Sequence, residues 1–221
     1  MEELNANPEK IENLFLHLII QRIREWIKFA DERLKGTGIK CFVCPDNDDR
    51  FEIDSIIQES ETVINAESKV IRIDDYHEMI STGWTNPTPW NTFRECCENE
   101  LYKKIEVLAS QLTDVSNPIF NLHAPPYGST LDEAPELDEE LRPKYAGRAL
   151  VSVSSASVRD IILKYQPLLG LHGRIHESTG EYKIGRTLCL NPGSQYEQGI
   201  LMGYIIDLDK KGIKRFFRTS G

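Results

Sequence analysis

Three side chains that could bind a metal each follow a short apolar segment of the sequence: Asn47, His123 and His176. In open α/β sheets, sites collect beyond the carboxyl ends of the strands, so we expect these side chains to converge at one sheet edge. The amide oxygen of Asn and the imidazole of His are neutral donors of intermediate hardness, which suit Mn, Fe, Zn or Ni. The pattern therefore makes these three residues candidate metal ligands.

The elements that must position these residues follow from hydrophobic periodicity. Apolar residues recur at helical spacing in four segments, which are 8–34, 51–57, 95–112 and 155–165. Segments typical of strands are 39–44, 62–65, 70–73, 77–82, 119–122, 168–171, 182–184, 187–190, 200–207 and 213–218. We expect Ser154 or Ser155 to cap the last helix and the strands between 62 and 82 to form a meander. The alternation of helices with short strands predicts an α/β fold.

The 221 residues suit one domain, with a leading helix in 1–38 and the motif-bearing core in 39–221. No apolar run could span a bilayer, and the polar opening MEELNANPEK is unlike a secretory signal, so we expect a cytoplasmic protein without membrane contact. The net charge of −9 argues against a broad grip on nucleic acid. That charge does not exclude nucleic-acid binding through a local basic patch, and the tail carries one, although a solvated hairpin or terminal strand accounts for it better: Lys210, Lys211, Lys214, Arg215 and Arg218.

Cysteine usage does not indicate a zinc site. Cys41 and Cys44 form a C-x-x-C pair, but neither Cys96–Cys97 nor Cys189 supplies a second pair at the required spacing. We expect Cys41 to lie in a buried strand, where cysteine behaves as a small hydrophobe.

Four blocks of the sequence, taken in order, carry a specific resemblance. They read CPDNDD at 44–49, NLHAPP at 121–126, LHGRIHES at 171–178 and NPGS at 191–194. In their order and rough spacing they resemble the Asn, single-His, Gly-His-x-His and Asn-Pro-Gly-Ser blocks of calcineurin-like metallophosphoesterases. The resemblance implies an α/β sandwich of mixed sheets flanked by helices.

The resemblance also implies roles for single residues. In that family, two divalent metals hold a phosphate ester while an activated water attacks phosphorus. Asn47 and His123 would bind the second metal and His176 the first. Asp48 stands where many members carry a His that assists the leaving group or binds phosphate.

Three departures separate this sequence from the family pattern. No Asp-x-His occurs, so we expect the fold to lack its opening strands, the main ligands of the first metal and the bridging carboxylate. Arg174 replaces the first His of Gly-His-x-His, and a guanidinium has no lone pair for a metal. Asp46 replaces the usual Gly before Asn47, at some cost if that position requires a positive φ.

Structural roles compete with these assignments. We expect His172 and His77 to pack in the interior and Asn191 to cap a turn. Glu177 could orient His176 or simply be exposed. Two tryptophans, Trp84 and Trp90, are expected to pack under the Pro-rich loop 83–93 rather than wall a cleft, and 133–144 reads as an exposed excursion.

Two functions follow as hypotheses. In the first, a missing or partner segment completes the two-metal site, and Arg174 binds the phosphate of a phosphoester substrate bidentately. In the alternative, the chain is a degenerate, non-catalytic scaffold whose open sheet edge calls for a partner or self-association. A nucleotide-binding α/β domain ranks last, because no Gly-rich phosphate loop follows any strand.

Overall fold

The computed structural model describes residues 7–221, so the first six residues of the polar opening lie outside the described part. The chain divides into two compact units, one formed by residues 7–45 with 49–67 and the other by 46–48 with 68–221. Each unit has its own sheet and is described separately. That both belong to one domain, with a leading helix ending at residue 38, stays a prediction.

The first unit is built on the long helix α2 (Pro8–Leu34), which begins and ends where the periodicity places it. Asn7 caps it by accepting a hydrogen bond from the Lys10 N–H at 3.3 Å. The short helix α3 (Glu52–Ile57) and the parallel strands β1 (Cys41–Val43) and β2 (Val63–Asn65) complete the unit.

The core of this unit involves only the C-terminal half of α2. Ile53, Ile57 and Val63 are buried, and the helix residues that pack against them are Ile23, Ile27 and Ala30. Towards the start of the helix the apolar side chains are largely exposed, Leu14 by 44% and Leu18 by 50%. The apolar face of α2 is therefore covered by the core of this unit along part of the helix only.

Two sequence expectations fail in this unit. Segment 62–65 does not join a meander, because β2 pairs in parallel with β1. The strand at 41–44 is only partly covered, since Cys41 and Phe42 are half-buried and Val43 is exposed. Within residues 7–221, the five cysteines form no disulfide.

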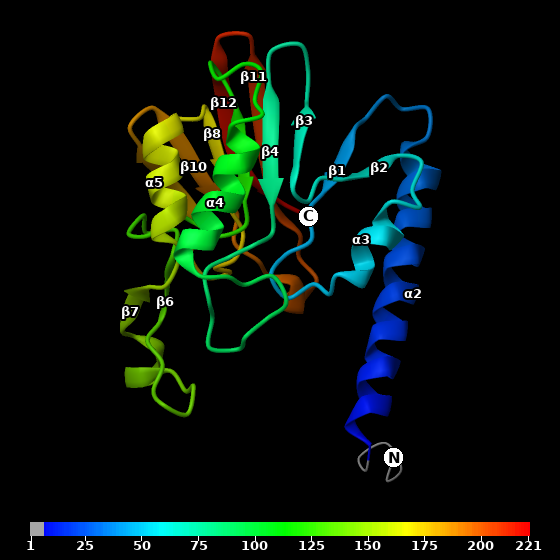
Figure 1. Ribbon diagram of the computed structural model, residues 1–221, viewed down its shortest axis with the longest axis vertical. Helices are drawn as coiled ribbons and strands as arrows, with labels where there is room; N and C mark the ends of the chain where they lie inside the picture. The colour runs from blue at the N-terminus through cyan, green and yellow to red at the C-terminus, as the bar shows by residue number, and fades with distance from the viewer. Residues whose placement is uncertain (1–6) are drawn as a thin grey trace. The chain divides into compact units, whose positions relative to one another are not determined.

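The second unit contains a six-stranded mixed sheet in the order β3-β4-β5-β8-β10-β9 (Figure 1). Its four central strands are parallel, and the edge strands β3 and β9 run antiparallel to their neighbours. The bounds are β3 Lys69–Arg72, β4 Glu78–Thr82, β5 Ile119–Leu122, β8 Leu169–Leu171, β9 Gly180–Ile184 and β10 Thr187–Asn191. The predicted strands are thus present, and 70–73 pairs with 77–82 as two adjacent strands of the expected meander.

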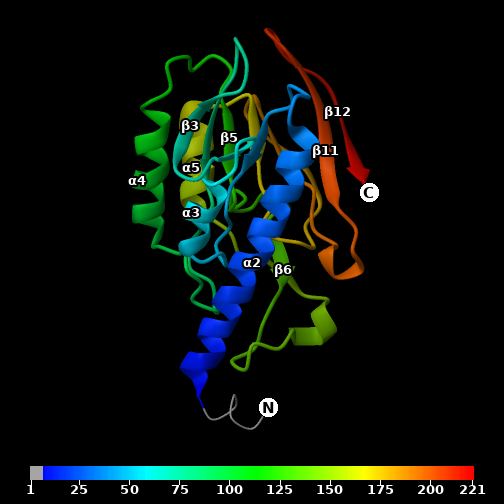
Figure 2. The ribbon, with the colours of Figure 1, turned by 90° about the vertical axis from the view of Figure 1, so that its right-hand side faces the viewer.

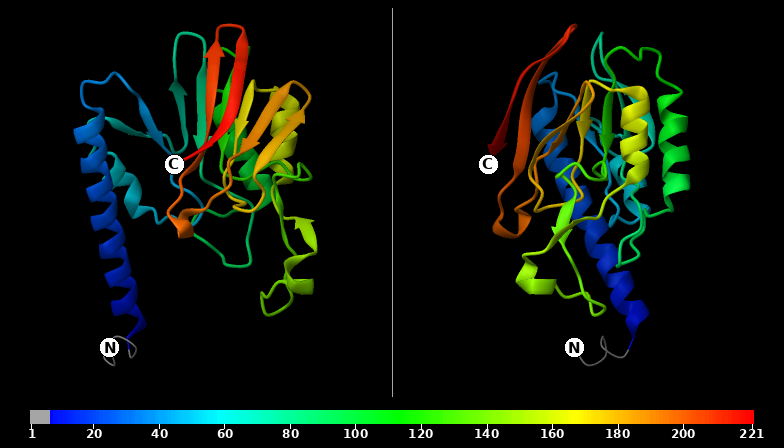
Figure 3. Two further views of the ribbon diagram at one scale, coloured as in Figure 1. Left: turned by 180° about the vertical axis from the view of Figure 1, so that it is seen from behind. Right: turned by 90° about the vertical axis from the view of Figure 1, so that its left-hand side faces the viewer.

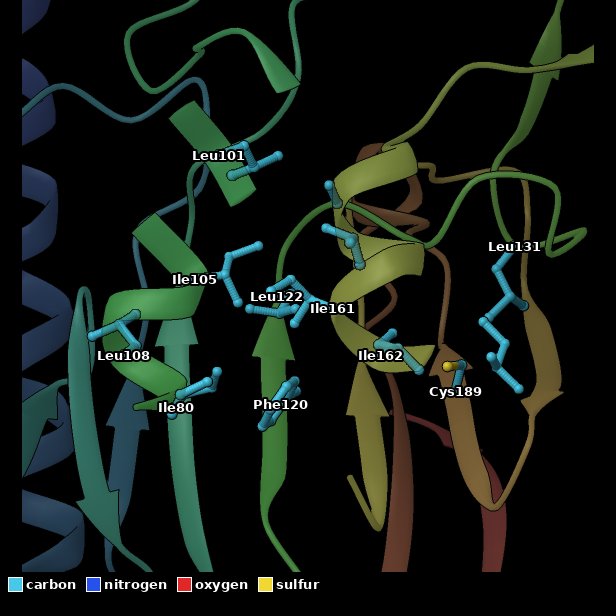
Figure 4. Packing of buried hydrophobic residues seen from close by; sticks show 14 residues of the cluster. Ile80, Leu101, Ile105, Leu108, Phe120, Leu122, Leu131, Ile161, Ile162 and Cys189 are labelled. Atoms are coloured by element: carbon cyan, nitrogen blue, oxygen red, sulfur yellow. The ribbon is translucent and has the colours of Figure 1, made fainter. Parts of the chain in front are cut away.

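Helices α4 (Glu98–Ala109) and α5 (Ala156–Tyr165) lie side by side on one face of this sheet (Figures 2 and 3). Their apolar faces meet the central strands in one buried cluster that includes Ile105, Phe120 and Ile161 (Figure 4). The opposite face carries the hairpin of β11 (Met202–Asp209) and β12 (Gly212–Ser220), as Figure 3 shows. The unit is therefore a mixed α/β fold with a layered, sandwich-like arrangement.

The entry into α5 follows the predicted cap. The Ser155 hydroxyl accepts the Val158 N–H at 3.1 Å, and the Glu98 carboxylate accepts the N–H groups of Ala156 and Ser157. The first turn of α5 is thereby satisfied from α4, so its N-terminal donors are not orphaned.

Segment 133–144, which the sequence indicated as an exposed excursion, contains a strand that was not predicted. β6 (Glu133–Pro135) pairs antiparallel with β7 (Leu150–Ser152), and a turn at Lys144–Gly147, in which Tyr145 and Ala146 have positive φ, lies between them. None of the three residues of β6 is fully buried, which explains why no apolar period marked it. The basic tail forms the expected hairpin, β11–β12. Among residues 7–221, no helix is both long and apolar enough to cross a membrane.

The core position of α5 yields a stability prediction. Ile161→Ala removes a side chain with 0% exposure and should lower the free energy of unfolding by about 2–5 kcal/mol. Leu163→Ala, on the same helix but 49% exposed, is the matched control and should change it by less than about 0.5 kcal/mol. Urea unfolding followed by circular dichroism measures both. Equal effects of the two variants would contradict this packing.

Candidate functional site

The carboxyl ends of three parallel strands are tied together through the backbone of His123. Its N–H donates to the Thr82 carbonyl at 3.0 Å, and its carbonyl accepts the N–H groups of Gly173 and Arg174, each at 3.1 Å. Thr82 ends β4, His123 follows β5, and Gly173 follows β8. Residues far apart in the sequence are thus fixed at one sheet edge.

The His123 imidazole sits in a mixed electrostatic environment. Burial lowers its pKa to about 4; nearby Asp46 acts against this, whereas Arg174 and His176 lower it further. The ring is therefore neutral at pH 7, with a nitrogen lone pair available to accept a hydrogen bond or bind a metal.

Asn47 lies at this edge with one end of its amide already engaged. Its Nδ2 donates to Thr92 Oγ1 at 2.7 Å, and its backbone carbonyl accepts the Arg94 N–H at 3.0 Å. The amide oxygen is accordingly the acceptor that Asn47 offers to a ligand. Asp46 takes no positive φ, so replacing the family's Gly here causes no strain of that kind.

Asp48 is exposed, and its N–H donates to Asp46 Oδ1 at 2.9 Å. This short turn orients the backbone around Asn47. The part that the Asp48 carboxylate plays at this edge stays a prediction.

Arg174 is half-buried and is held by a neutral acceptor. Its Nη1 donates to Asn86 Oδ1 at 2.6 Å, and Asn86 Nδ2 donates in turn to the Val153 carbonyl at 3.2 Å. A guanidinium remains cationic here and cannot replace the imidazole lone pair that the Gly-His-x-His pattern supplies.

Three carboxylates lie near enough to act electrostatically on this cation, and the sequence did not single them out. Burial lowers the pKa of Arg174, while the negative charges of Glu95, Glu98 and Asp132 raise it. Each carboxylate also accepts hydrogen bonds locally; Asp132, which is fully buried, accepts the N–H groups of Gly128 and Ser129. The cation is thus balanced by groups brought from separate segments.

Glu95 is the one of these that a sequence signal could have found. The spacing of Thr92 and Glu95 is that of a capping box, and the Thr92 N–H does donate to the Glu95 carboxylate at 3.0 Å. Burial raises the pKa of Glu95, but hydrogen bonds from Thr88 and Thr92 outweigh this effect and hold the pKa below its usual value. Glu95 therefore stays ionised and organises the loop that carries Asn86.

His176 lies at the rim of the site and is exposed. Its ring meets the edge of Tyr196, with centroids 5.7 Å apart and planes at 78°. Both side chains line a cavity of about 340 Å³, bounded also by Arg218 of β12. Glu177 is exposed and lines the same cavity.

The predicted turn at Asn191 is confirmed. Asn191 Oδ1 accepts the Gly193 N–H at 3.0 Å, and its Nδ2 donates to the Ile175 carbonyl at 2.8 Å. Gly193 has φ +70°, and a Cβ there would lie 2.8 Å from the His176 carbonyl oxygen. Glycine is therefore required, and the turn is fixed against His176.

His172 and His77 are interior residues, as expected. His172 Nδ1 donates to the carbonyls of Leu122 and Ala124, and burial lowers its pKa to about 4. His77 is buried with Nδ1 against the Asp74 carboxylate at 2.8 Å.

The two tryptophans differ. Trp84 packs against the core cluster beneath Lys104 Nζ, which lies 3.9 Å from the ring centroid. Trp90 is 64% exposed, so the expectation that it packs under the loop is wrong. The Thr88 N–H donates to the Glu95 carboxylate and the Trp90 N–H donates to the Thr88 hydroxyl, so the loop backbone is held while the indole stays outside.

The residues present do not by themselves fit a two-metal centre. Within residues 7–221, no three His, Cys, Asp or Glu side chains come close enough to hold a metal ion. Asn47 and His123 offer neutral donors, but the Arg174 cation lies beside His123 and, in this described part of the chain, no carboxylate bridges the position. A metal here needs further ligands.

Comparison with known proteins supports the fold and leaves the activity open. No known family profile matches the sequence. The chain is 32% identical over 131 residues to "Uncharacterized protein MJ1162" of Methanocaldococcus jannaschii, a match that covers 58% of this chain and 53% of that protein. It therefore spans about half the length of this relative.

Two solved structures share the fold over 90% of this chain. One has a TM-score of 0.61 at 19% identity, with 74% of that chain covered. The other, TT1561 of Thermus thermophilus, has a TM-score of 0.58 at 14% identity, with 79% covered. At these identities the likeness concerns the fold alone.

The low pKa of His123 leads to a pH prediction. A pKa of about 4 in the folded protein lies below the unfolded value of about 6.5, so the unfolded chain binds more protons between these pH values. Stability should consequently fall as the pH drops from about 6.5 towards 4. In NMR titrations, the His123 ring signals, assigned with His123→Gln, should show a midpoint near pH 4. A midpoint near 6.5 would refute the buried, neutral imidazole.

Proposed function

We propose that this chain forms part of a calcineurin-like metallophosphoesterase domain and contributes one edge of a site that hydrolyses phosphoesters. The observation that carries the proposal is the convergence of His123 and Arg174 at the ends of the parallel strands, with Asp46, the neighbour of Asn47, close enough to act on the His123 imidazole. The four sequence blocks in family order support it: two of them carry His123 and Arg174, and the block at 191–194 forms the turn fixed against His176.

In this proposal the residues share the work of binding a phosphate group. Arg174 supplies a permanent positive charge, and its guanidinium has donors beyond the one that bonds to Asn86. His123, neutral at pH 7, and the Asn47 oxygen would be this chain's donors to a divalent Mn, Fe, Zn or Ni ion, with His176 at the rim. Asp48 would face the leaving group. Further ligands must come from outside residues 7–221.

A second candidate is a non-catalytic scaffold that retains the fold for binding or assembly. It is favoured by the way Arg174 is held: Asn86 fixes the guanidinium, and Glu95, Glu98 and Asp132 balance its charge. In that case Arg174 is a structural replacement for a ligand, and the surface acts through a partner chain or a second copy.

Phosphate affinity tests the first candidate. Arg174→Gln removes the cation while keeping a hydrogen-bonding side chain, and should weaken binding of inorganic phosphate about 10- to 100-fold, as expected for charge-assisted hydrogen bonds. Titration calorimetry measures this. Arg142→Gln is the matched control, because Arg142 pairs with nearby Asp138 and Glu140 on the surface. Equal affinity in wild type and Arg174→Gln would sink the phosphate-binding role.

Restoring the histidine of the Gly-His-x-His pattern at position 174 distinguishes the two candidate functions further. Arg174→His exchanges the cation for a neutral donor beside His123 and should raise the affinity for Mn²⁺ or Zn²⁺ at least tenfold if the edge is a metal edge. Calorimetry with each ion measures this, and p-nitrophenyl phosphate esters report any turnover when the other ligands are supplied. If His at this position leaves metal affinity unchanged, the scaffold function is favoured.

A further inference from the structure

The cavity beside His176 has the size and lining of a binding pocket for a single ring. Its volume of about 340 Å³ lies at the lower end of the range of roughly 300–1,000 Å³ seen for small-molecule pockets. One wall is the Tyr196 ring and Met202, and the remaining lining is polar and includes Gln195, Ser194 and Arg218. Such a pocket suits one small group rather than a polymer.

The pocket is built onto the candidate site by the main chain. The Ser194 N–H donates to the His176 carbonyl at 3.2 Å, and Thr179 Oγ1 donates to the Pro192 carbonyl at 3.2 Å. On the other side, the Tyr204 hydroxyl donates to the Gly180 carbonyl at 3.0 Å and fastens the β11–β12 hairpin to the sheet. His176 lines this pocket and follows Arg174 by two residues, so a ligand bound at Arg174 would have the pocket as its neighbour.

The charges lining the pocket narrow the class of ligand. Glu177 and Glu197 contribute two carboxylates against the single guanidinium of Arg218, so a second phosphate group would be repelled. Carboxylates, amides and a guanidinium together can accept and donate hydrogen bonds to several hydroxyl groups, and an aromatic face packs against the apolar side of a ring. This combination matches a neutral ring rich in hydroxyl groups.

We propose that this pocket binds the alcohol part of the phosphoester substrate, and that this part is a hydroxyl-rich ring such as a sugar. The inference rests on the proposed phosphoester function, because it places the phosphate at Arg174 and the sugar beyond His176. Tyr196 stacks on the ring, while Gln195 and the carboxylates bind its hydroxyl groups.

Two probes of equal charge test the proposal. Ribose 5-phosphate should bind about tenfold more tightly than methyl phosphate, roughly what an aromatic contact and one hydrogen bond contribute. Tyr196→Ala should reduce this ratio to about one, whereas Tyr196→Phe should retain most of it because the ring remains. Tyr145→Ala, at a residue 76% exposed and outside the pocket, is the matched control. Titration calorimetry on the full chain measures all four proteins.

A third probe separates failure of the pocket from failure of the phosphate site. Methyl riboside, which carries no phosphate, should shift the NMR signals of Tyr196, Gln195 and Arg218 at millimolar concentration. If it does so while neither phosphate probe binds, the affinity of the pocket for a sugar ring stands, whereas its role in binding a phosphoester substrate fails together with the proposed function. If neither methyl riboside nor ribose 5-phosphate shifts these signals, or if Tyr196→Ala leaves the affinity ratio near ten, the pocket proposal is overturned.

Discussion

The candidate site depends on the two hydrogen bonds that the backbone carbonyl of His123 accepts. By accepting the N–H groups of both Gly173 and Arg174, it fixes the chain after β8 against the end of β5, while its own N–H reaches β4. Packing of α4 and α5 over Phe120 and the neighbouring strands holds β5 in place. The positions of the side chains at this edge are therefore determined by main-chain hydrogen bonds and by the buried core between the central strands and the two helices.

Much of this fold could be predicted from the sequence, because local patterns determine local elements. The periodicity located α2 to the residue, and the Ser155 cap and the Asn191 turn follow from short-range hydrogen bonding. The partner of β2 could not be predicted, since three residues carry no information about pairing. β6 could not be predicted because its residues are only partly buried and include a proline.

The candidate site was predictable to the extent that strands define it. His123 and Arg174 come together because parallel strands end at one edge. The balancing carboxylates were not predictable in the same way, since Glu98 reaches the start of α5 across 57 residues and Asp132 is positioned by its own loop. Electrostatic partners of a buried cation are a product of tertiary structure, and no spacing in the sequence encodes them.

The guanidinium of Arg174 gives this edge a charge that does not respond to acidity. An imidazole at the same place would gain or lose a proton within the range of pH that cells experience, and any process coupled to it would be switched accordingly. A residue that stays protonated throughout, bonded to Asn86 and close enough to three carboxylates to feel their charge, removes that switch at this position. Of the two residues joined by the His123 carbonyl bond, only His123 changes its charge with pH, and it titrates well below neutrality.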